Sequence, residues 1–453
     1  MNVAVIGGGW AGLSAAVRLR QNGCTVTVFE ASRTLGGRAR RVQSPTLGAS
    51  IDNGQHILLG AYTETLALMQ ELGLDSQTLL HRERLHLQSA DGSFSLHARA
   101  LPAPLNLLSA IIGARGLSIS ERLRLITIIQ ALKRQKWKTP PSQTVVQWLA
   151  QGRQSAHAIQ LFWQPLCLAA LNTPIQQACA QLFARVLQDS LGGPKAASDV
   201  LISRVDLSQL WPEQVVRYTP AKTAGQFEIR CGHAVRQLTC DASQVEVDGK
   251  AYDAVVVAGN APATHRLLRQ LSPSESGARY LNMLAALEYI PIATLTLQLK
   301  SAWRLPHAML LLKDNPAKLQ FGQWLFDCST FMQSQAASPL LNIVISDARG
   351  LMEHEETAVI AAVIKQVQAQ CSRFGAMPEV VKHELIIEKR ATFAATPSLQ
   401  RPPNRSPWPR VWVAGDWTDT GYPAVLEAAV RSGKAAALGI AGHTSQVAIS
   451  AKD

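Results

Sequence analysis

The chain has 453 residues, 47% of them hydrophobic and 17% charged, which is typical of a folded protein long enough for two domains. With 44 Lys and Arg against 32 Asp and Glu, its formal net charge of +12 suits an anionic membrane surface, but the chain lacks a nucleic-acid recognition motif and we expect no nucleic acid as partner. The seven cysteines are odd in number and show no C-x-x-C spacing, so we expect buried thiols of a reduced cytoplasm rather than a disulfide framework.

The N-terminal stretch predicts a strand, a tight turn and a helix that together bind a dinucleotide. Residues 2–6 form an apolar, β-branched run typical of a buried strand, and residues 11–20 are rich in helix formers. Between them, Gly7, Gly9 and Gly12 have the G-x-G-x-x-G spacing. In this motif the glycines permit the turn, the close approach of a pyrophosphate and the packing of the helix on its strand.

The next segment indicates which dinucleotide is bound. A second predicted strand, 25–29, ends at Glu30, where a carboxylate is expected to bind an adenosine ribose. Gly36 and Gly37 then lead to Arg38, whose guanidinium can bind a phosphate bidentately. The glycine turn, the acid and this G-G-R sequence resemble the superfamily of FAD-dependent amine oxidases and phytoene desaturases. The resemblance implies FAD as the cofactor.

Periodicity and turn residues predict the elements that follow along the chain. They are a helix at 62–72, a hairpin at 85–97, helices from 101 to about 192 with a capping box at 118–121, a segment at 227–238 followed by a hairpin, buried strand 254–258, strands 283–299 and 340–346, amphipathic helix 355–374, and strand 411–414 after the proline-rich loop 397–409.

The resemblance implies an α/β architecture in which two domains are interleaved. A Rossmann-like FAD-binding domain of the GR2 flavoprotein type would comprise residues 1–80, 216–265 and 385–453. An α+β substrate-binding domain would comprise residues 81–215 and 266–384. Only the resemblance, and not the composition of the segments, implies that the three FAD-binding pieces meet.

The C-terminal segment contains a second set of cofactor residues. Strand 411–414 runs into Gly415 and Asp416, a carboxylate suited to ribityl or pyrophosphate-side hydroxyls. A predicted helix follows, with Tyr422 and Pro423 near its first turn, so that its N-terminus faces a flavin carbonyl that becomes negative on reduction. The superfamily has a strand-G-D loop and a Y-P helix at this place.

By the same resemblance, Val235 in the sequence GHAV would hold the adenine through its backbone. The full set of cofactor-binding residues that the resemblance implies is Gly7, Gly9, Trp10, Ala11, Gly12, Glu30, Ala31, Gly37, Arg38, Gln55, His56, Val235, Gly415, Asp416, Tyr422, Pro423, Ala424 and Val425.

The middle of the chain narrows the family. Residues 162–174, with the sequence FWQPLCLAALNTP, and the stretches 186–191, 204–208 and 323–327 resemble the squalene-associated branch, the hydroxysqualene dehydroxylases. Without that resemblance, 162–174 is an apolar helix ended by Asn-Thr-Pro, for which core packing is the ordinary explanation. The branch implies reductive dehydroxylation of hydroxysqualene in squalene and hopanoid biosynthesis, with upstream squalene-pathway enzymes as candidate partners.

Such a reaction needs a dry tunnel, a hydride and a proton for the departing hydroxyl, and we expect no metal. His56 is the first candidate donor because imidazole titrates near neutral pH, although a histidine that merely packs beside the cofactor fits equally well. Asp52 is a candidate to orient His56 or to bind Arg38. Asp327 is a second acid in an apolar setting that would raise its pKa, and Tyr422 is a candidate to line the flavin.

A long isoprenoid must reach the enzyme from a bilayer, because moving thirty carbons into water costs on the order of 20 kcal/mol. The apolar stretch 101–117 precedes a helix that ends in the basic sequence 133–138, which contains Trp137. Segment 101–138 is therefore a candidate for peripheral membrane attachment through Trp137 and the lysines, and a core helix with a solvated basic end is the alternative. The predicted strand directly after Met1 leaves no room for a signal peptide, so we expect a cytoplasmic protein on the inner face of the membrane.

Three other functions remain open. A carotenoid desaturase of the same fold would oxidise a polyene instead of reducing an alcohol. An amine or protoporphyrinogen oxidase would need a flavin-contacting lysine, for which Lys300 and Lys313 are candidates. A non-catalytic prenyl-chain carrier, like the Rab GDP-dissociation inhibitors that share this fold, is disfavoured by the intact cofactor motifs at Gly7, Gly9, Gly12, Glu30, Arg38 and Asp416.

Overall fold

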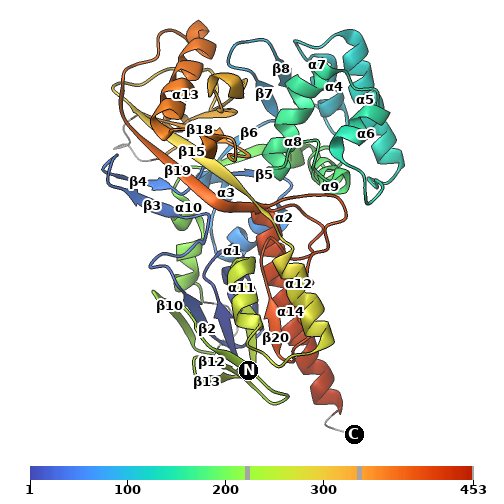
Figure 1. The fold of residues 1–453 in the computed structure, drawn as a ribbon, viewed down its shortest axis with the longest axis vertical. Helices are drawn as coiled ribbons and strands as arrows, with labels where there is room; N and C mark the ends of the chain where they lie inside the picture. The colour runs from blue at the N-terminus through green and yellow to red at the C-terminus, as the bar shows by residue number, and fades with distance from the viewer. Residues whose placement is uncertain (220–224, 334–338, 451–453) are drawn as a thin grey trace.

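In the computed structural model, one parallel sheet takes its strands from three segments that lie far apart in the sequence (Figure 1). The strand order is β10-β2-β1-β14-β20, and every adjacent pair is parallel. The strands are β1 (Asn2–Ile6), β2 (Thr25–Glu30), β10 (Phe227–Cys231), β14 (Ala254–Val257) and β20 (Val411–Val413). The structure describes residues 1–219, 225–333 and 339–450, so parts of the predicted segments 216–265, 266–384 and 385–453 lie outside the described residues.

Both faces of this sheet are covered, which explains why its strands are almost continuously apolar. Helices α1 (Trp10–Gln21) and α14 (Leu426–Ser450) pack together on one face, where Leu19 and Ala436 join the strand residues in one core cluster. The small sheet of β11 (Leu238–Cys240), β12 (Val245–Val247) and β13 (Lys250–Tyr252) lies against the other face. The predicted strands 2–6, 25–29, 254–258 and 411–414 are confirmed to within one residue at their ends.

The second sheet is antiparallel. Helix α13 (Glu356–Gln370) covers one of its faces, and the other face lines the molecule's main cavity. Its order is β16-β17-β18-β15-β19, with β15 (Tyr289–Leu299) paired along most of β19 (Val380–Phe393). The other strands are β16 (Met309–Leu311), β17 (Trp324–Asp327) and β18 (Leu340–Ile345). Leu295, Leu325 and Ile343 point to the face that α13 covers, so their neighbours along each strand point the other way.

A helical lobe lies beside this second sheet (Figure 1). It comprises α4 (Leu105–Ile112), α5 (Ile119–Arg134), α6 (Val145–Gln151), α7 (Ala156–Ala158), the π-helical turn η1 (Ile159–Trp163), α8 (Gln164–Leu171) and α9 (Ala180–Leu191). The predicted capping box is confirmed, since Ser118 and Glu121 each bond the other's backbone N–H at the start of α5. The indole rings of Trp148 and Trp163 meet edge to face, with their centroids 5.3 Å apart, a spacing typical of aromatic pairs.

The chain has further helices and strands around these two sheets and the helical lobe. They include β3 (Arg41–Ser44), β4 (Ala49–Asp52), β5 (Ile57–Leu59), α2 (Thr63–Glu71), α3 (Ser76–Leu79), β6 (Leu80–Glu83), β7 (His86–Gln88), β8 (Ser95–His97), β9 (Val200–Ser203), α10 (Leu207–Leu210), α11 (Ala261–Leu268) and α12 (Glu275–Ala285). Strands β7 and β8 form the hairpin predicted at 85–97.

Three local predictions are wrong. The strand predicted at 283–299 begins only at Tyr289, because residues 283–285 belong to helix α12, which buries Tyr280 and Leu284 on one face. Pro423 lies before α14, which begins at Leu426. Cys231, at the end of edge strand β10, is exposed, whereas the other six cysteines are buried or half-buried.

Trp137 also departs from its predicted place at a membrane interface. Trp137 is only 8% exposed and belongs to the core cluster of the helical lobe. A Cβ placed on Gly192 would stand 2.8 Å from the Trp137 ring, so the indole packs directly on the glycine that ends α9. Trp137 therefore does not accompany the basic residues 133–138 at the protein surface, contrary to the prediction.

Asn172 fastens the end of α8 to the second sheet. It takes the left-handed conformation, with φ 48°, and its side chain is buried. Its amide Nδ2 donates to Thr392 Oγ1 at 3.0 Å and to the Ile290 carbonyl at 3.2 Å, while its Oδ1 accepts from the Asp347 N–H at 2.7 Å. The Asn-Thr-Pro stop of the sequence is thus a junction between the helical lobe and the sheet.

Replacing Asn172 with Ala is expected to lower the free energy of unfolding by about 3 kcal/mol, because buried partners lose their bonds and Ala is strained at positive φ. Chemical unfolding of the purified protein measures the change. Asn282→Ala, an exposed position on α12, is the matched control and should leave stability unchanged. Equal stability of the two variants would contradict the assigned role of Asn172.

Candidate active site

A cavity of about 1120 Å³ extends from the carboxyl end of the parallel sheet to the second sheet and the helical lobe. This exceeds the roughly 300–1,000 Å³ of a pocket for one drug-sized ligand. Its walls come from both sheets, from the helical lobe and from the loop before α14. The cavity therefore has room for a dinucleotide and a second molecule.

At the lower end of the cavity, the chain presents bare backbone. Gly7 has a φ of +118°, and a Cβ there would stand 2.6 Å from the Ala258 carbonyl oxygen, so only glycine fits. A Cβ on Gly12 would stand 1.9 Å from the carbonyl oxygen of Gly7, which explains the close packing of α1 on its strand. At Gly9, by contrast, the nearest atom to an added Cβ is Gly37 Cα at 3.6 Å. The backbone at Gly9 therefore borders open space, the nucleotide cradle, which a side chain would fill.

Glu30 is fixed at the wall of this cradle by two backbone donors. The Gly8 N–H donates to its Oε2 at 2.6 Å and the Ser32 N–H donates to its Oε1 at 2.7 Å. These bonds anchor the carboxylate at the end of β2 and fix the direction of its two oxygens. A fixed carboxylate here is suited to the hydroxyls of a ribose.

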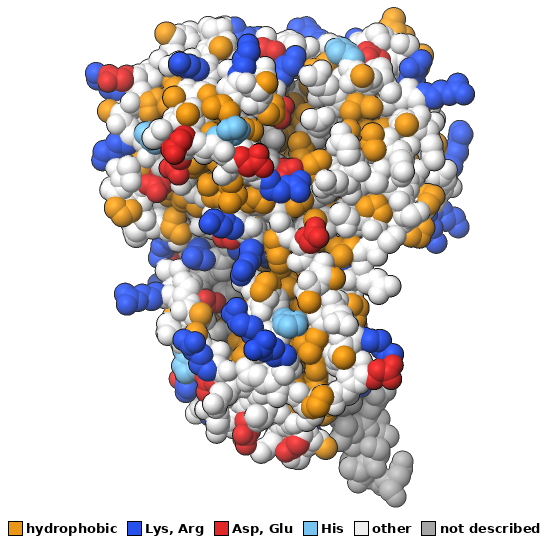
Figure 2. Space-filling view, viewed as in Figure 1, with side chains coloured by type: hydrophobic (Ala, Val, Ile, Leu, Met, Phe, Trp, Pro, Cys, Tyr) orange, Lys and Arg blue, Asp and Glu red, His pale blue; other side chains and the backbone are white. Residues whose placement is uncertain are grey.

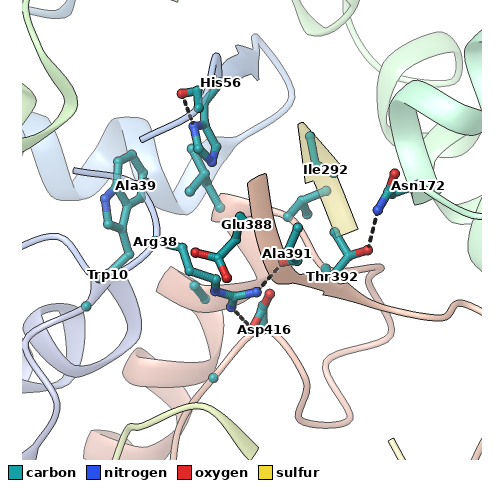
Figure 3. A pocket seen from close by; sticks show the side chains of 18 of the residues that line it. Trp10, Arg38, Ala39, His56, Asn172, Ile292, Glu388, Ala391, Thr392 and Asp416 are labelled. Atoms are coloured by element: carbon teal, nitrogen blue, oxygen red, sulfur yellow. Dashed lines mark hydrogen bonds and ion pairs between the residues drawn. The ribbon is translucent and has the colours of Figure 1, made fainter. Parts of the chain in front are cut away.

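Arg38 joins the cradle to the C-terminal loop and to the upper sheet (Figure 3). Its Nη2 donates to Asp416 Oδ1 at 2.6 Å, and its Nη1 donates to the backbone carbonyl of Ala391 and, at 3.4 Å, to that of Arg390. Asp416 is buried at 7% exposure, so the guanidinium supplies the counter-charge that the carboxylate needs. A cation is thus held beside the glycines where a diphosphate would lie.

These features fit FAD. With the exception of Gly12 and Pro423, every residue expected to bind the cofactor lines the cavity, including Val235. Gly12 lies behind the turn, and Pro423 lies one residue before the lining residues Ala424 and Val425. The N-terminus of α1, the bare backbone at Gly9 and the Arg38 guanidinium together provide the donors and positive charge that a diphosphate requires.

His56 lines the cavity and is a neutral imidazole near neutral pH. Its Nδ1 lies 2.8 Å from the Gly54 carbonyl oxygen, so this nitrogen carries the proton and donates it to the backbone. Burial lowers the pKa of His56 and outweighs the Gly54 bond, which raises it, and the nearby Arg38 cation lowers it further. The remaining nitrogen, Nε2, can only accept a hydrogen bond, which does not suit the proton-donating role predicted for His56.

Asp52 and Asp327 lie outside the cavity, contrary to the prediction. Asp52 Oδ1 accepts from the Leu207 N–H at 2.9 Å, and burial raises the pKa of Asp52 to about 7. Arg38 pairs with Asp416 instead of Asp52. Asp327 shares its side of β17 with Leu325, because alternate strand residues point in opposite directions, and it caps the following turn by accepting from Ser329. Burial also raises the pKa of Asp327.

The upper half of the cavity is lined mainly by apolar side chains. The helical lobe and the hairpin supply Leu85, Leu87, Leu96, Leu107, Phe162, Leu166, Leu168, Leu171, Val186 and Leu191, and the second sheet supplies Ile292, Met309, Trp324, Phe326 and Val344. Among the lining residues that come from 81–215, Asp189 is the only one with an ionisable side chain. This half suits a long hydrocarbon.

Sequence reasoning missed Asp189 and the cavity residues of β19. Figure 3 shows Glu388, Ala391 and Thr392 from this strand facing Arg38 and Asn172. The stretch 380–393 mixes charged and apolar residues, and its alternation was the only local signal of a strand. Asp189 lies in a predicted helix, but the direction in which its side chain points depends on how that helix packs.

The lysines considered for a flavin contact are elsewhere. The side chain of Lys300 is 69% exposed, and its Nζ pairs with Glu379 at 2.9 Å. Lys313 borders a different pocket, whose volume is about 280 Å³. Within the described residues, the main cavity has no lysine in its wall. Neither candidate lysine therefore lies in the main cavity.

Comparisons with known proteins agree with the fold and with an FAD site. The family model for flavin containing amine oxidoreductase matches residues 10–441. The chain is 29% identical over 450 residues to the hydroxysqualene dehydroxylase of Rhodopseudomonas palustris, covering 96% of this chain and 97% of that protein. It is 22% identical over 483 residues to the zeta-carotene desaturase of Arabidopsis thaliana, covering 96% and 84%. The solved cyclohexylamine oxidase of Brevibacterium oxydans has the same fold, with a TM-score of 0.68 at 17% identity over 98% of this chain and 99% of that one.

Gly9→Ala is expected to weaken FAD binding at least tenfold, about 1.4 kcal/mol, without unfolding the protein. The added methyl meets only ordinary contacts in the protein but occupies the cradle where the backbone approaches the diphosphate. Titration of the apoprotein with FAD measures the dissociation constant. Gly442→Ala is the control, because its Cβ would have no neighbour within 4 Å; an unchanged FAD affinity in Gly9→Ala would argue against the cradle.

Proposed function

The chain belongs to the flavin-containing amine oxidoreductase family, and from this premise we propose that it is an FAD-dependent oxidoreductase that converts hydroxysqualene to squalene. The observation that carries the proposal is a hydrocarbon-lined half-cavity that opens directly onto the nucleotide cradle. Full-length likeness to a hydroxysqualene dehydroxylase supports the choice of substrate.

The reaction removes an allylic hydroxyl as water and places a hydride on the carbon. Bound FAD, in its reduced form, supplies that hydride. Arg38 and Asp416 hold the nucleotide side of the cavity in place, and Glu30 secures the ribose end. The residues of the chain therefore have two further tasks, which are to exclude water around the reacting carbon and to provide a proton.

Exclusion of water follows from the composition of the upper wall. Side chains such as Phe162, Leu168 and Trp324 surround the space beside the nucleotide end. When a long isoprenoid fills this space, little water remains to capture an allylic cation before the hydride arrives. The apolar wall thus favours reduction over return to the alcohol.

We also propose that the enzyme takes its substrate from a membrane through the helical lobe. Of the large hydrophobic residues that are exposed in the described chain, half gather in one short segment; they are Leu101, Leu105, Ile112, Ile119 and Leu123. Leu107, on the same helix as Leu105 and Ile112, lines the cavity. Figure 2 shows Lys and Arg side chains along the outer edge of this lobe, which suits an anionic lipid surface.

These exposed side chains define a shallow apolar surface next to the cavity wall. None of the helices in the described part of the chain is long and apolar enough to cross a bilayer. Attachment would therefore be peripheral, with Ile112 and Ile119 in the headgroup region and the isoprenoid passing beside Leu107. Trp137 has no part in this surface because it is buried.

The reduced enzyme, incubated with hydroxysqualene without oxygen, is expected to form squalene while the yellow absorbance of oxidised FAD returns in equal amount. Chromatography of the extract and the visible spectrum provide the two measurements. A parallel incubation of oxidised enzyme with phytoene tests the carotenoid desaturase alternative. Desaturated carotenoid, and no squalene from the alcohol, would overturn the proposal in favour of that alternative.

The double variant Ile112→Glu/Ile119→Glu is expected to bind anionic phosphatidylglycerol vesicles at least tenfold more weakly, about 1.4 kcal/mol. Charged side chains cannot enter the interface as the isoleucines do. Vesicle co-sedimentation measures the partition, and turnover of detergent-solubilised hydroxysqualene should stay close to that of the parent. Val381→Glu, at a position with 53% exposure on β19, is the control; equal binding by both variants would contradict this docking surface.

A further inference from the structure

We propose that Tyr422, held between Arg185 and Asp189, donates the proton that turns the substrate's hydroxyl into departing water. This inference rests on the proposed function and assigns the acid that the reaction requires. Tyr422 would be the catalytic residue, and Arg185 and Asp189 would position its hydroxyl and stabilise its charge.

The three side chains lie where the two halves of the cavity meet. Tyr422 comes from the loop before α14 and lines the cavity together with Ala424 and Val425 at the nucleotide end. Asp189 comes from α9, where Val186 and Ser190 line the cavity on the same helical face. Asp189 is the only ionisable lining residue from 81–215, so the hydrocarbon-lined part of the helical lobe carries charge only beside Tyr422.

The Tyr422 hydroxyl is bonded on two sides. It accepts from Arg185 Nη2 at 2.5 Å and donates to Asp189 Oδ2 at 2.5 Å. Arg185 and Asp189 are also an ion pair along α9, with Nε and Oδ1 3.3 Å apart. The Tyr422 ring is 5% exposed, and its backbone carbonyl accepts from Arg401 Nη1 at 2.7 Å. The phenol is therefore held by two partners in the cavity wall, with a cation against its oxygen.

Four other ionisable residues of the cavity wall are bonded to partners elsewhere. Glu30 accepts two backbone N–H groups, and Asp416 pairs with Arg38. His56 uses its proton in a bond to Gly54, and His233 pairs with Asp248 at 2.9 Å. None of these four groups is bonded to Asp189, the one ionisable residue that the helical lobe contributes to the wall, whereas Tyr422 is.

Glu388 and Tyr62 also line the cavity and are the other side chains to weigh as proton donors. Glu388 accepts from the Arg390 N–H at 3.2 Å, and it comes from β19, on the Arg38 side of the cavity. Burial raises the pKa of Tyr62, and the neighbouring carboxylates and Tyr422 raise it further, without a cation among these influences. For Tyr422, burial and the bond to Asp189 raise the pKa. The Arg185 bond and the Arg431 cation, whose Cζ lies 4.9 Å from the ring centroid, act in the opposite direction. Arg185 thus distinguishes Tyr422 from the second phenol of the wall.

The Tyr422 hydroxyl turns its proton from Asp189 to the allylic oxygen of the substrate. Its O–H bond breaks as the proton is transferred, and the C–O bond breaks with both electrons leaving in water. The carbon receives the hydride that reduced FAD supplies, giving the hydrocarbon and oxidised cofactor. Arg185 stabilises the phenolate until a proton from solvent restores Tyr422. One alcohol, one hydride and one proton thus give one hydrocarbon and one water.

The test compares two substrates, hydroxysqualene and its allylic acetate, because acetate departs as an anion without needing a proton. Tyr422→Phe keeps the ring and is expected to slow the alcohol reaction by at least about 100-fold. It should convert the acetate at a rate within a few-fold of the parent. Bound FAD, measured by absorbance, should remain one per chain. Tyr252→Phe, which removes a buried hydroxyl without a hydrogen-bond partner and outside the cavity wall, is the matched control.

A purely structural role would slow both substrates equally, and this result would overturn the inference, as would a Tyr422→Phe enzyme that reduces the alcohol like the parent. A parent enzyme that makes no squalene would instead refute the proposed function. Arg185→Gln provides a second measurement that is independent of turnover. The absorbance of ionised Tyr422 is obtained at each pH by subtracting the spectrum of Tyr422→Phe. It should appear at higher pH in Arg185→Gln than in the parent, and an unshifted titration would contradict the role of Arg185.

Discussion

The Arg38 guanidinium is the point at which distant parts of this chain are joined. It extends from the segment after the glycine turn, pairs with Asp416 in the C-terminal loop and donates to backbone carbonyls of β19. Because Asp416 is buried, the carboxylate requires this cation, and the loop that carries it is drawn to the carboxyl end of the parallel sheet. The same cation lies beside bare glycine backbone, so the contact that closes the fold also prepares a site for a diphosphate.

The cavity that this closure creates has two chemically different halves. The lower half offers fixed charges and backbone donors, whereas the upper half offers mainly hydrocarbon. A heterolytic reaction of a hydrocarbon alcohol needs both properties, since the chain must be kept dry while charge develops at one carbon. The junction of the halves, where α9 meets the loop before α14, is the place where a charged network and the apolar wall are in contact.

The cofactor half could be predicted from the sequence because its signals are local. Gly7, Gly9 and Glu30 belong to one strand–turn–helix–strand unit, whose geometry is set by backbone conformation over thirty residues. Predictions that depended on side-chain direction were less successful. Asp327 proved to share a strand face with Leu325, and Trp137 proved to be buried under the end of α9. Nothing in the local sequence specifies which face of a strand or helix meets the cavity.

The amino-acid sequence by itself determined an FAD-type nucleotide cradle, the apolar character of the middle segment and most of the strands of the parallel sheet. Only the tertiary structure decided which polar groups stand beside the hydrocarbon wall. Tyr422 and Asp189 are 233 positions apart, and their bond exists because α9 and the C-terminal loop pack against the same cavity. Local spacing constrains the backbone through steric rules that act over a few residues, whereas contacts at such separations depend on how whole elements pack.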